Sequence, residues 1–174
     1  MEGIIIGGIV ALLLVWIISV QRRLTGMEEN LKDAMKQVGV LLSSHLEALT
    51  ALLDRSYAYV GRKSQELLSI VSSRRNVITA DSNPTEVQAQ ERLIGEVLKD
   101  FSAMAERFPE MKRDEAIAKS LDAIDSYGKM VRTGCLIYND SVTKWNRELR
   151  LFPNSLVAKL FGFHRREPMV IAEK

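Results

Sequence analysis

The side chains best suited to catalysis or metal binding are few in this chain and far apart. It has two histidines, His45 and His164, and one cysteine, Cys135. A Ser-His-Asp site would have to use one of these histidines, and neither has a second metal ligand at the usual spacing. The sequence also lacks a glycine-rich phosphate loop and a dinucleotide-binding fingerprint. We therefore expect a protein that is not an enzyme, with no metal ion, no cofactor and no small-molecule substrate.

The remaining charged and nucleophilic residues have ordinary structural explanations. The acidic pairs Glu28-Glu29 and Glu47 with Asp54 lie on helix faces that are otherwise polar. Cys135 lies on an apolar helical stripe, and a reactive thiol needs an exposed, positively charged setting. With 24 basic and 22 acidic residues the net charge is +2, so no strong field indicates a nucleic-acid partner.

The strongest signal is an uncharged apolar run over residues 3–20, which reads GIIIGGIVALLLVWIISV. As a helix it would span about 27 Å, close to the hydrocarbon thickness of a bilayer. A cleaved secretory signal is the competing interpretation, but such a signal carries its positive charges before the apolar run, not after it. We therefore expect residues 1–23 to form a retained anchor in a lipid bilayer. The residues that define this anchor are Gly3, Gly7, Ala11, Trp16, Arg22 and Arg23.

The charges that flank this run predict its orientation. Four basic residues follow it closely and none precedes it; they are Arg22, Arg23, Lys32 and Lys36. The positive-inside rule then predicts a single-pass protein of the bacterial inner membrane, with the N-terminus outside and the body in the cytoplasm. A periplasmic or extracellular body is the alternative. Gly3, Gly7 and Ala11 form a small-xxx-small face, which favours close approach of two membrane helices.

Beyond Arg23 the apolar pattern is helical almost everywhere, so we expect an all-α fold. Helices are expected over residues 85–107 and 113–151, antiparallel because the turn between them is short, with Thr85 and Gln88 as a capping box. Residues 24–74 form either one rod or two helices, 24–43 and 45–74. The capping box Ser44-His45-Leu46-Glu47 favours the two helices. The result is an elongated up-and-down bundle of three long or four helices over residues 24–153, followed by an apolar and basic tail over residues 154–174.

One stripe of the long helix at 113–151 alternates spacings of three and four over five heptads, which predicts near-parallel packing on neighbouring helices. It comprises Ile117, Leu121, Ile124, Gly128, Val131, Cys135, Tyr138, Val142, Trp145, Leu149 and Phe152. Gly128, and Gly134 beside the stripe, each cost about 1 kcal/mol relative to alanine. They either allow a close helix crossing or are simply tolerated.

The C-terminal third resembles the LemA family, whose usual pattern is Tyr-Asn-x-x-Val-x-x-Tyr-Asn, then Phe-Pro, then Gly-Phe. The matching residues here are Tyr138, Asn139, Val142, Trp145, Asn146, Phe152, Pro153, Gly162 and Phe163. The resemblance implies a four-helix bundle on a membrane anchor and does not supply a reaction. The family usually has a proline near the position of Ser44-His45-Leu46-Glu47, and this chain has none there.

The motif residues have both structural and functional interpretations. Tyr138 and Trp145 are expected in the core, whereas Asn139 and Asn146 either fix helix register by hydrogen bonds or line a partner surface. The tail after Pro153 either folds back to cap the bundle or lies on an anionic membrane surface. We expect a scaffold or adaptor that forms homo-oligomers or recruits other membrane-associated proteins. A sensor that binds a small ligand in the bundle core, near Gly128, Gly134 and Ser141, is the alternative.

Overall fold

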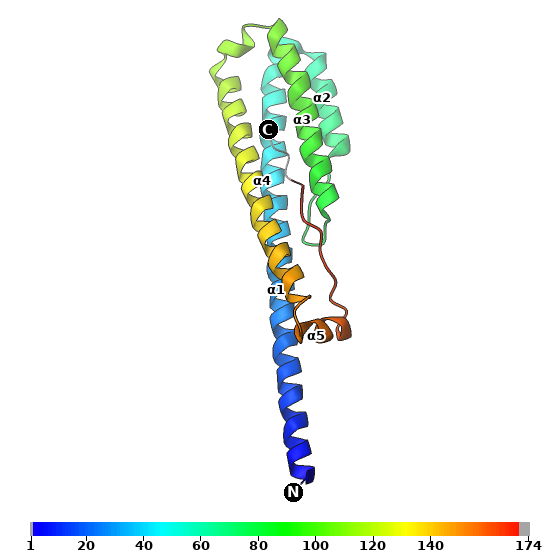
Figure 1. Cartoon of the computed structure of the whole chain (residues 1–174). Helices are drawn as coiled ribbons and strands as arrows, with labels where there is room; N and C mark the ends of the chain where they lie inside the picture. Colours follow the sequence, from blue (N-terminus) through cyan, green and yellow to red (C-terminus); the bar gives the residue numbers. More distant parts are fainter. Residues whose placement is uncertain (1, 171–174) are drawn as a thin grey trace.

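The computed structural model describes residues 2–170, and within them the chain consists of helices joined by short connections (Figure 1). The elements are α1 (Glu2–Val60), α2 (Arg62–Arg74), α3 (Pro84–Arg107), the 3-10 turn η1 (Met111–Arg113), α4 (Glu115–Glu148) and α5 (Asn154–Leu160). No strand occurs between residues 2 and 170. The all-α fold expected from the apolar pattern is therefore confirmed.

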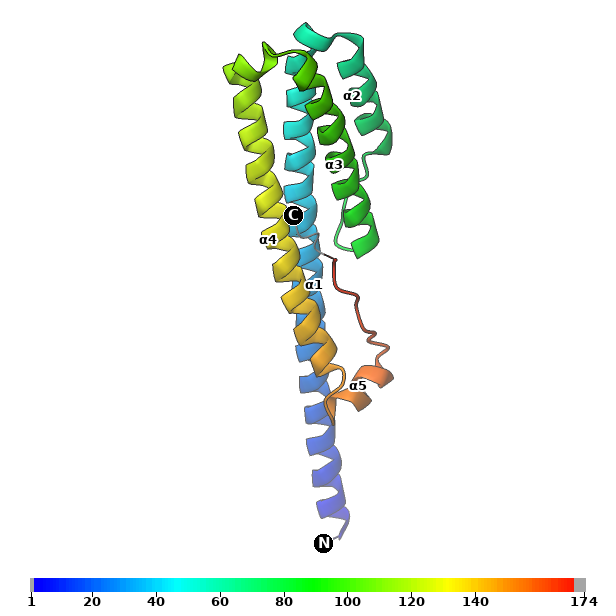
Figure 2. The same ribbon diagram turned by 45° about the horizontal axis from the view of Figure 1, so that its top comes forward.

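Helices α1 to α4 run alternately up and down along one axis (Figures 1 and 2). The most extensive contact is between α1 and α4. The shorter helices α2 and α3 cover only the part of α1 that is far from the N-terminus. The molecule is thus a four-helix bundle at its distal end and a two-helix pair nearer the N-terminus, and the first turns of α1 project alone.

The core between α1 and α4 follows the predicted stripe, with two exceptions. Most stripe residues of α4 are buried, including Val131, Tyr138 and Trp145. Leu121 is 40% exposed because the preceding Ser120 faces α1 instead, where its hydroxyl accepts a hydrogen bond from Arg55. Phe152 is 79% exposed because α4 ends at Glu148, so its position no longer follows the helical period.

The predicted break at Ser44-His45 is wrong, because α1 continues through it without interruption. Leu42, Leu46 and Leu49 continue the buried face of α1 across this region, so a break would remove apolar surface from the core. A capping box also needs a residue that leaves helical geometry, and no proline is present to force this. The break comes instead at Gly61, whose φ of 53° and ψ of −122° suit glycine alone.

The start of α3 also differs from the prediction, which placed the capping box at Thr85 and Gln88. Asn83 is the N-cap: its Oδ1 accepts from the Glu86 main-chain nitrogen at 3.0 Å, and its Nδ2 donates to Glu86 Oε1 at 3.1 Å. Pro84 then occupies the first helical position, where its missing N–H costs nothing. The helix therefore begins two residues earlier than a Thr85 cap would allow.

The loop between α2 and α3 depends on a glycine in α1. Ile78 from this loop is buried against α1 at Gly39. A Cβ atom at position 39 would collide with the main-chain carbonyl of Ile78. Gly39 therefore permits a close approach of two main chains, whereas Gly26 in the same helix has no neighbouring atom within 4 Å of its Cβ position.

Replacing these two glycines with alanine should have opposite effects on stability. Gly26→Ala should raise the free energy of unfolding by about 1 kcal/mol, because alanine is the better helix former. Gly39→Ala gains the same helix propensity but should lower the free energy of unfolding by roughly 1–3 kcal/mol, because the added methyl overpacks against the loop. Urea unfolding of the full chain in detergent measures both, and equal stabilisation by the two variants would refute the close contact at Ile78.

Candidate functional site

A segment near the C-terminus lies extended along α4, where it is bound by the α4 residues that match the family pattern. We call residues 164–170 the tail segment; residues 171–174 lie outside the described part of the chain. It follows α5 and returns towards the distal end of the bundle, antiparallel to α4 (Figures 1 and 2). The part of the tail that the structure describes therefore folds back on the bundle, as the capping interpretation expects, but residues 164–170 lie along α4 and do not cover one end of the bundle.

Two asparagines of α4 make the main contacts with the tail segment. Asn139 accepts a hydrogen bond from the Met169 nitrogen through Oδ1 at 2.7 Å and donates to the Met169 carbonyl through Nδ2 at 2.9 Å. Asn146 makes the same pair of bonds with Arg166, at 3.0 Å and 2.8 Å. Each side-chain amide therefore satisfies both main-chain groups of one tail residue, as a neighbouring strand would.

The spacing of the two asparagines matches the geometry of the tail segment. Seven residues of α-helix rise about 10.5 Å, and three residues of extended chain cover about 10 Å. Asn139 and Asn146 can therefore bind Met169 and Arg166 at the same time. Asparagine suits this role because its side chain offers both a donor and an acceptor, whereas an ionised aspartate offers acceptors only. We call this arrangement the asparagine clamp.

Aromatic side chains of the same helix face complete the clamp. Trp145 Nε1 donates to the His164 carbonyl at 2.9 Å, and its ring meets Phe163 edge-on, with centroids 5.6 Å apart. The Tyr138 hydroxyl donates to the Glu167 carbonyl at 3.4 Å, and burial raises the pKa of this phenol, so it remains a donor. The bodies of both rings are buried in the core as expected, while their polar atoms bind the tail segment.

A charged contact joins three elements at the end of α4 nearest the apolar run. Glu148 is buried, and its carboxylate accepts hydrogen bonds from Arg23 Nη2 at 3.0 Å and from Asn154 Nδ2 at 2.9 Å. The contact thereby ties α1, α4 and the start of α5 together. Arg166 of the tail segment also contacts Glu28 of α1, at 3.2 Å. The sequence carries no signal for Glu148, because acidic residues near helix ends are common on solvated faces.

The predicted anchor residues lie apart from the clamp, and Arg23 reaches α4 through Glu148 instead. A Cβ atom at Gly3 or Gly7 would meet no atom within 4 Å. Trp16 is partly buried and packs at the edge of the core. Of the other motif residues, Phe163 contacts Trp145, and Gly162 has a φ of 73° where the chain turns away from α5.

The glycines of α4 allow a close crossing with α1. A Cβ atom at Gly128 would lie 3.3 Å from Cε1 of His45, and one at Gly134 would lie 3.2 Å from side-chain atoms of Val38 and Leu41. Burial raises the pKa of the neighbouring Cys135 to about 12, so its thiol stays protonated and unreactive at neutral pH. Between residues 2 and 170, no three His, Cys, Asp or Glu side chains are grouped as metal ligands.

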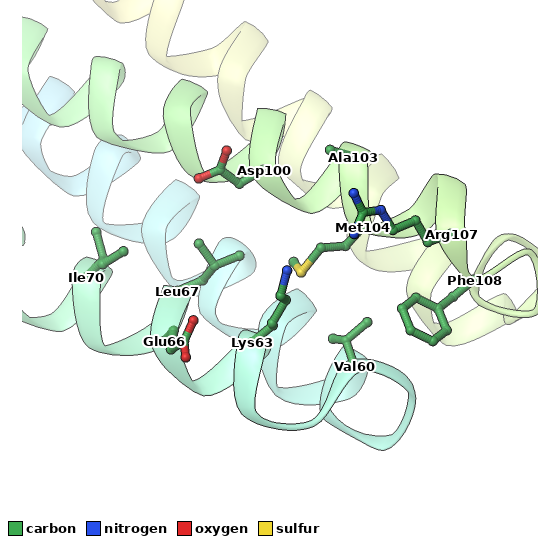
Figure 3. A pocket seen from close by; sticks show the side chains of 10 residues that line it. All are labelled: Val60, Lys63, Glu66, Leu67, Ile70, Asp100, Ala103, Met104, Arg107 and Phe108. Carbon is green, nitrogen blue, oxygen red and sulfur yellow. The ribbon is translucent and has the colours of Figure 1, made fainter.

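A groove of about 640 Å³ opens between α2 and α3 near the distal end of the bundle (Figure 3). Its apolar lining comes from Val60, Leu67, Ile70, Met104 and Phe108, together with Ala103. Both helices also contribute charged side chains to it, namely Lys63, Glu66, Asp100 and Arg107. A second, smaller hollow of about 330 Å³ lies on the surface beside Gly134.

The model of the LemA family matches this chain over residues 34–174, a range that contains the whole clamp and the tail segment. The chain belongs to the LemA family. Comparison with curated proteins finds no significant relative. In this LemA protein, the α4 part of the motif that carried the resemblance is thus the part that binds residues 164–170 of the same chain.

Loss of one clamp amide should release the tail segment. Asn139→Leu removes both bonds to Met169, and we expect faster hydrogen exchange over residues 164–170 together with a loss of roughly 1–3 kcal/mol in the free energy of unfolding. Ser141→Ala is the matched control, because the Ser141 hydroxyl bonds only to the Ile137 carbonyl of its own helix. The measurement is hydrogen exchange by mass spectrometry, and unchanged exchange in the Asn139→Leu chain would contradict the clamp.

Proposed function

We propose that this LemA protein is a non-enzymatic scaffold that α1 holds in the bacterial inner membrane, where it self-associates and recruits protein partners. The apolar start of α1 carries the proposal. This helix is long and apolar enough to cross a membrane, and only 6% of its most apolar window is buried within the chain. Such a large exposed apolar surface is otherwise rare on a soluble monomer. The bilayer is the environment that suits it.

The continuity of α1 supports a scaffold rather than a loosely tethered domain. The same helix supplies the apolar run and, from Leu24 to Leu53, the central part of the core. Its 59 residues correspond to a rod of about 88 Å. The body would therefore project from the bilayer at an angle set by the anchor. Confinement to a membrane plane raises the effective concentration of the bodies, so weak contacts between them can organise an assembly.

Self-association is supported by the small residues of the apolar run. Gly3, Gly7 and Ala11 lie on one face of α1, and no other part of the described chain occupies the space beside the two glycines. A second membrane helix can approach such a face closely, which gives it extensive van der Waals contact. Because α1 continues into the core, two helices paired at this face would also align their bodies.

A bulky residue on the small face should prevent this association. Gly7→Ile is expected to reduce the dimer captured by an amine-reactive crosslinker in native membranes by about tenfold, which corresponds to about 1.4 kcal/mol. Gly8→Ile adds the same side chain one residue along, about 100° around the helix, and should leave the dimer unchanged. Equal amounts of dimer in the two variants would exclude the small face as the interface.

The groove between α2 and α3 is the surface that we assign to partner recruitment. It lies at the end of the body farthest from the apolar run, and its lining includes Met104, Arg107 and Phe108, which are residue types enriched at protein interfaces. A small-ligand sensor is the alternative function, and the volume of this groove is the observation that favours it. The interior near Gly128 and Gly134 offers less support, because side chains of α1 pack against both glycines.

The flanking charges support a cytoplasmic body. Arg22, Arg23, Lys32 and Lys36 follow the apolar run, and the positive-inside rule places such residues on the cytoplasmic side. Alkaline phosphatase fused after Lys174 should therefore be inactive in a bacterial host, whereas a green fluorescent protein fused at the same position should fluoresce. The reverse pair of results would place the body outside and would overturn this orientation, without changing the anchor.

A further inference from the structure

The short helix α5 and the turn before it expose an unusual number of large apolar side chains. Five of the eleven residues 151–161 are exposed large apolar residues: Leu151, Phe152, Leu156, Leu160 and Phe161. Phe152 and Leu160 are 79% and 72% exposed. Solvent contact on this scale is costly for residues of this type, so such a cluster marks a surface that is covered in use.

The opposite face of α5 fixes this cluster rigidly to the body. Val157 and Ala158 are buried, and α5 contacts α1 directly. The Asn154 side chain donates to Glu148, which in turn pairs with Arg23. On the other side, the clamp binds the tail segment that follows α5. The helix is therefore held at both ends, and its exposed apolar face does not depend on a loose terminus.

The position of α5 identifies what covers this face. Arg23 lies three residues beyond the end of the uncharged run at residue 20, and α1 first becomes buried at Val20 and Leu24. The contact from Arg23 through Glu148 to Asn154 therefore places α5 at the level where α1 would leave the hydrocarbon. Figures 1 and 2 show α5 crossing beside α1 at this level rather than running along it.

The charges around α5 match a lipid surface. Residues 147–166 contain five basic residues and one acidic residue, Glu148, which is buried and paired with Arg23. The five are Arg147, Arg150, Lys159, Arg165 and Arg166; all are exposed, and Arg166 also pairs with Glu28. Apolar and aromatic side chains beside exposed arginines and lysines are typical of segments that lie in the headgroup region of anionic bilayers.

We propose that α5 is a second membrane contact, which inserts Phe152, Leu156, Leu160 and Phe161 into the boundary between headgroups and acyl chains. The inference rests on the proposed anchor, because α1 must cross the same bilayer. Two contacts on one rigid body fix the rotation of the bundle about the axis of α1 as well as its tilt, whereas a single spanning helix can still turn about its own axis. The tail thus both caps the bundle and touches the lipid.

Depth-dependent quenching tests this contact on the full chain reconstituted in phosphatidylcholine–phosphatidylglycerol vesicles that contain nitroxide-labelled lipid. An NBD fluorophore is attached to Leu156→Cys on α5, to Leu136→Cys on α4 as a control of equal exposure (57% and 55%), and to Ile9→Cys in the apolar run. The native Cys135 remains in place, because it is buried with a raised pKa and should not be labelled. Leu136 is a suitable control because it lies far from the expected bilayer. Gly134, two residues before it in α4, packs against Val38 of α1, and Val38 is about 27 Å along α1 from Val20.

We expect strong quenching at position 9, quenching several-fold above the control at position 156, and almost none at position 136. Quenching at 9 with equally weak quenching at 156 and 136 would overturn the second contact and leave the anchor intact. Weak quenching at all three positions would overturn the anchor and, with it, this inference. A blue-shifted but unquenched fluorophore at 156 would show that protein, such as a second copy of the chain, covers α5 instead of lipid.

Discussion

Main-chain hydrogen bonding runs without interruption from the apolar start of α1 into the centre of the bundle, and the other elements are arranged around this helix. The longest partner, α4, packs against it closely because Gly128 and Gly134 leave room for His45, Val38 and Leu41. The loop after α2 packs against it at Gly39, and α5 is linked to it through Arg23. Any force on the apolar run is therefore transmitted directly to the core, since no flexible linker intervenes.

The asparagine clamp makes the tail segment, residues 164–170, part of the folded body. The clamp has four amide hydrogen bonds, and each contributes about 1 kcal/mol net to the free energy of unfolding. Together they amount to a substantial fraction of the free energy of unfolding of a small domain. They recognise main-chain groups, so they fix the path of the tail segment independently of its side chains, of which Met169 is buried and Arg166 pairs with Glu28. This path in turn holds α5 beside α1, and the apolar face of α5 remains exposed, where it can contact the membrane.

Much of the helical architecture could be predicted from residue periodicity, and the errors have physical causes. The stripe of α4 was predicted because burial on one face requires apolar residues every three or four positions. The break at Ser44 was predicted wrongly because a capping box is a local pattern, and the buried leucines on both sides of it favoured continuation. The break at Gly61 was not predicted, because a glycine in a helical pattern does not by itself mark a break, and Gly26 and Gly39 lie inside α1 without interrupting it. The α3 cap was misplaced by two residues, because Thr85 and Asn83 are both good capping residues by type.

For the candidate site, residue types and spacing predicted which side chains are involved but not which groups they bind. Asn139 and Asn146 could be singled out from their spacing and from the family pattern, and Tyr138, Val142 and Trp145 could be assigned to the core. Their binding partners could not be found, because Met169 and Arg166 lie 30 and 20 residues away and only the return of the chain past α5 brings them back to α4. Helix periods and an uncharged run are local properties, so the residues alone determine them. The partner of a side-chain amide and the exposure of α5 depend on contacts between distant segments, and only the packed tertiary structure decides these.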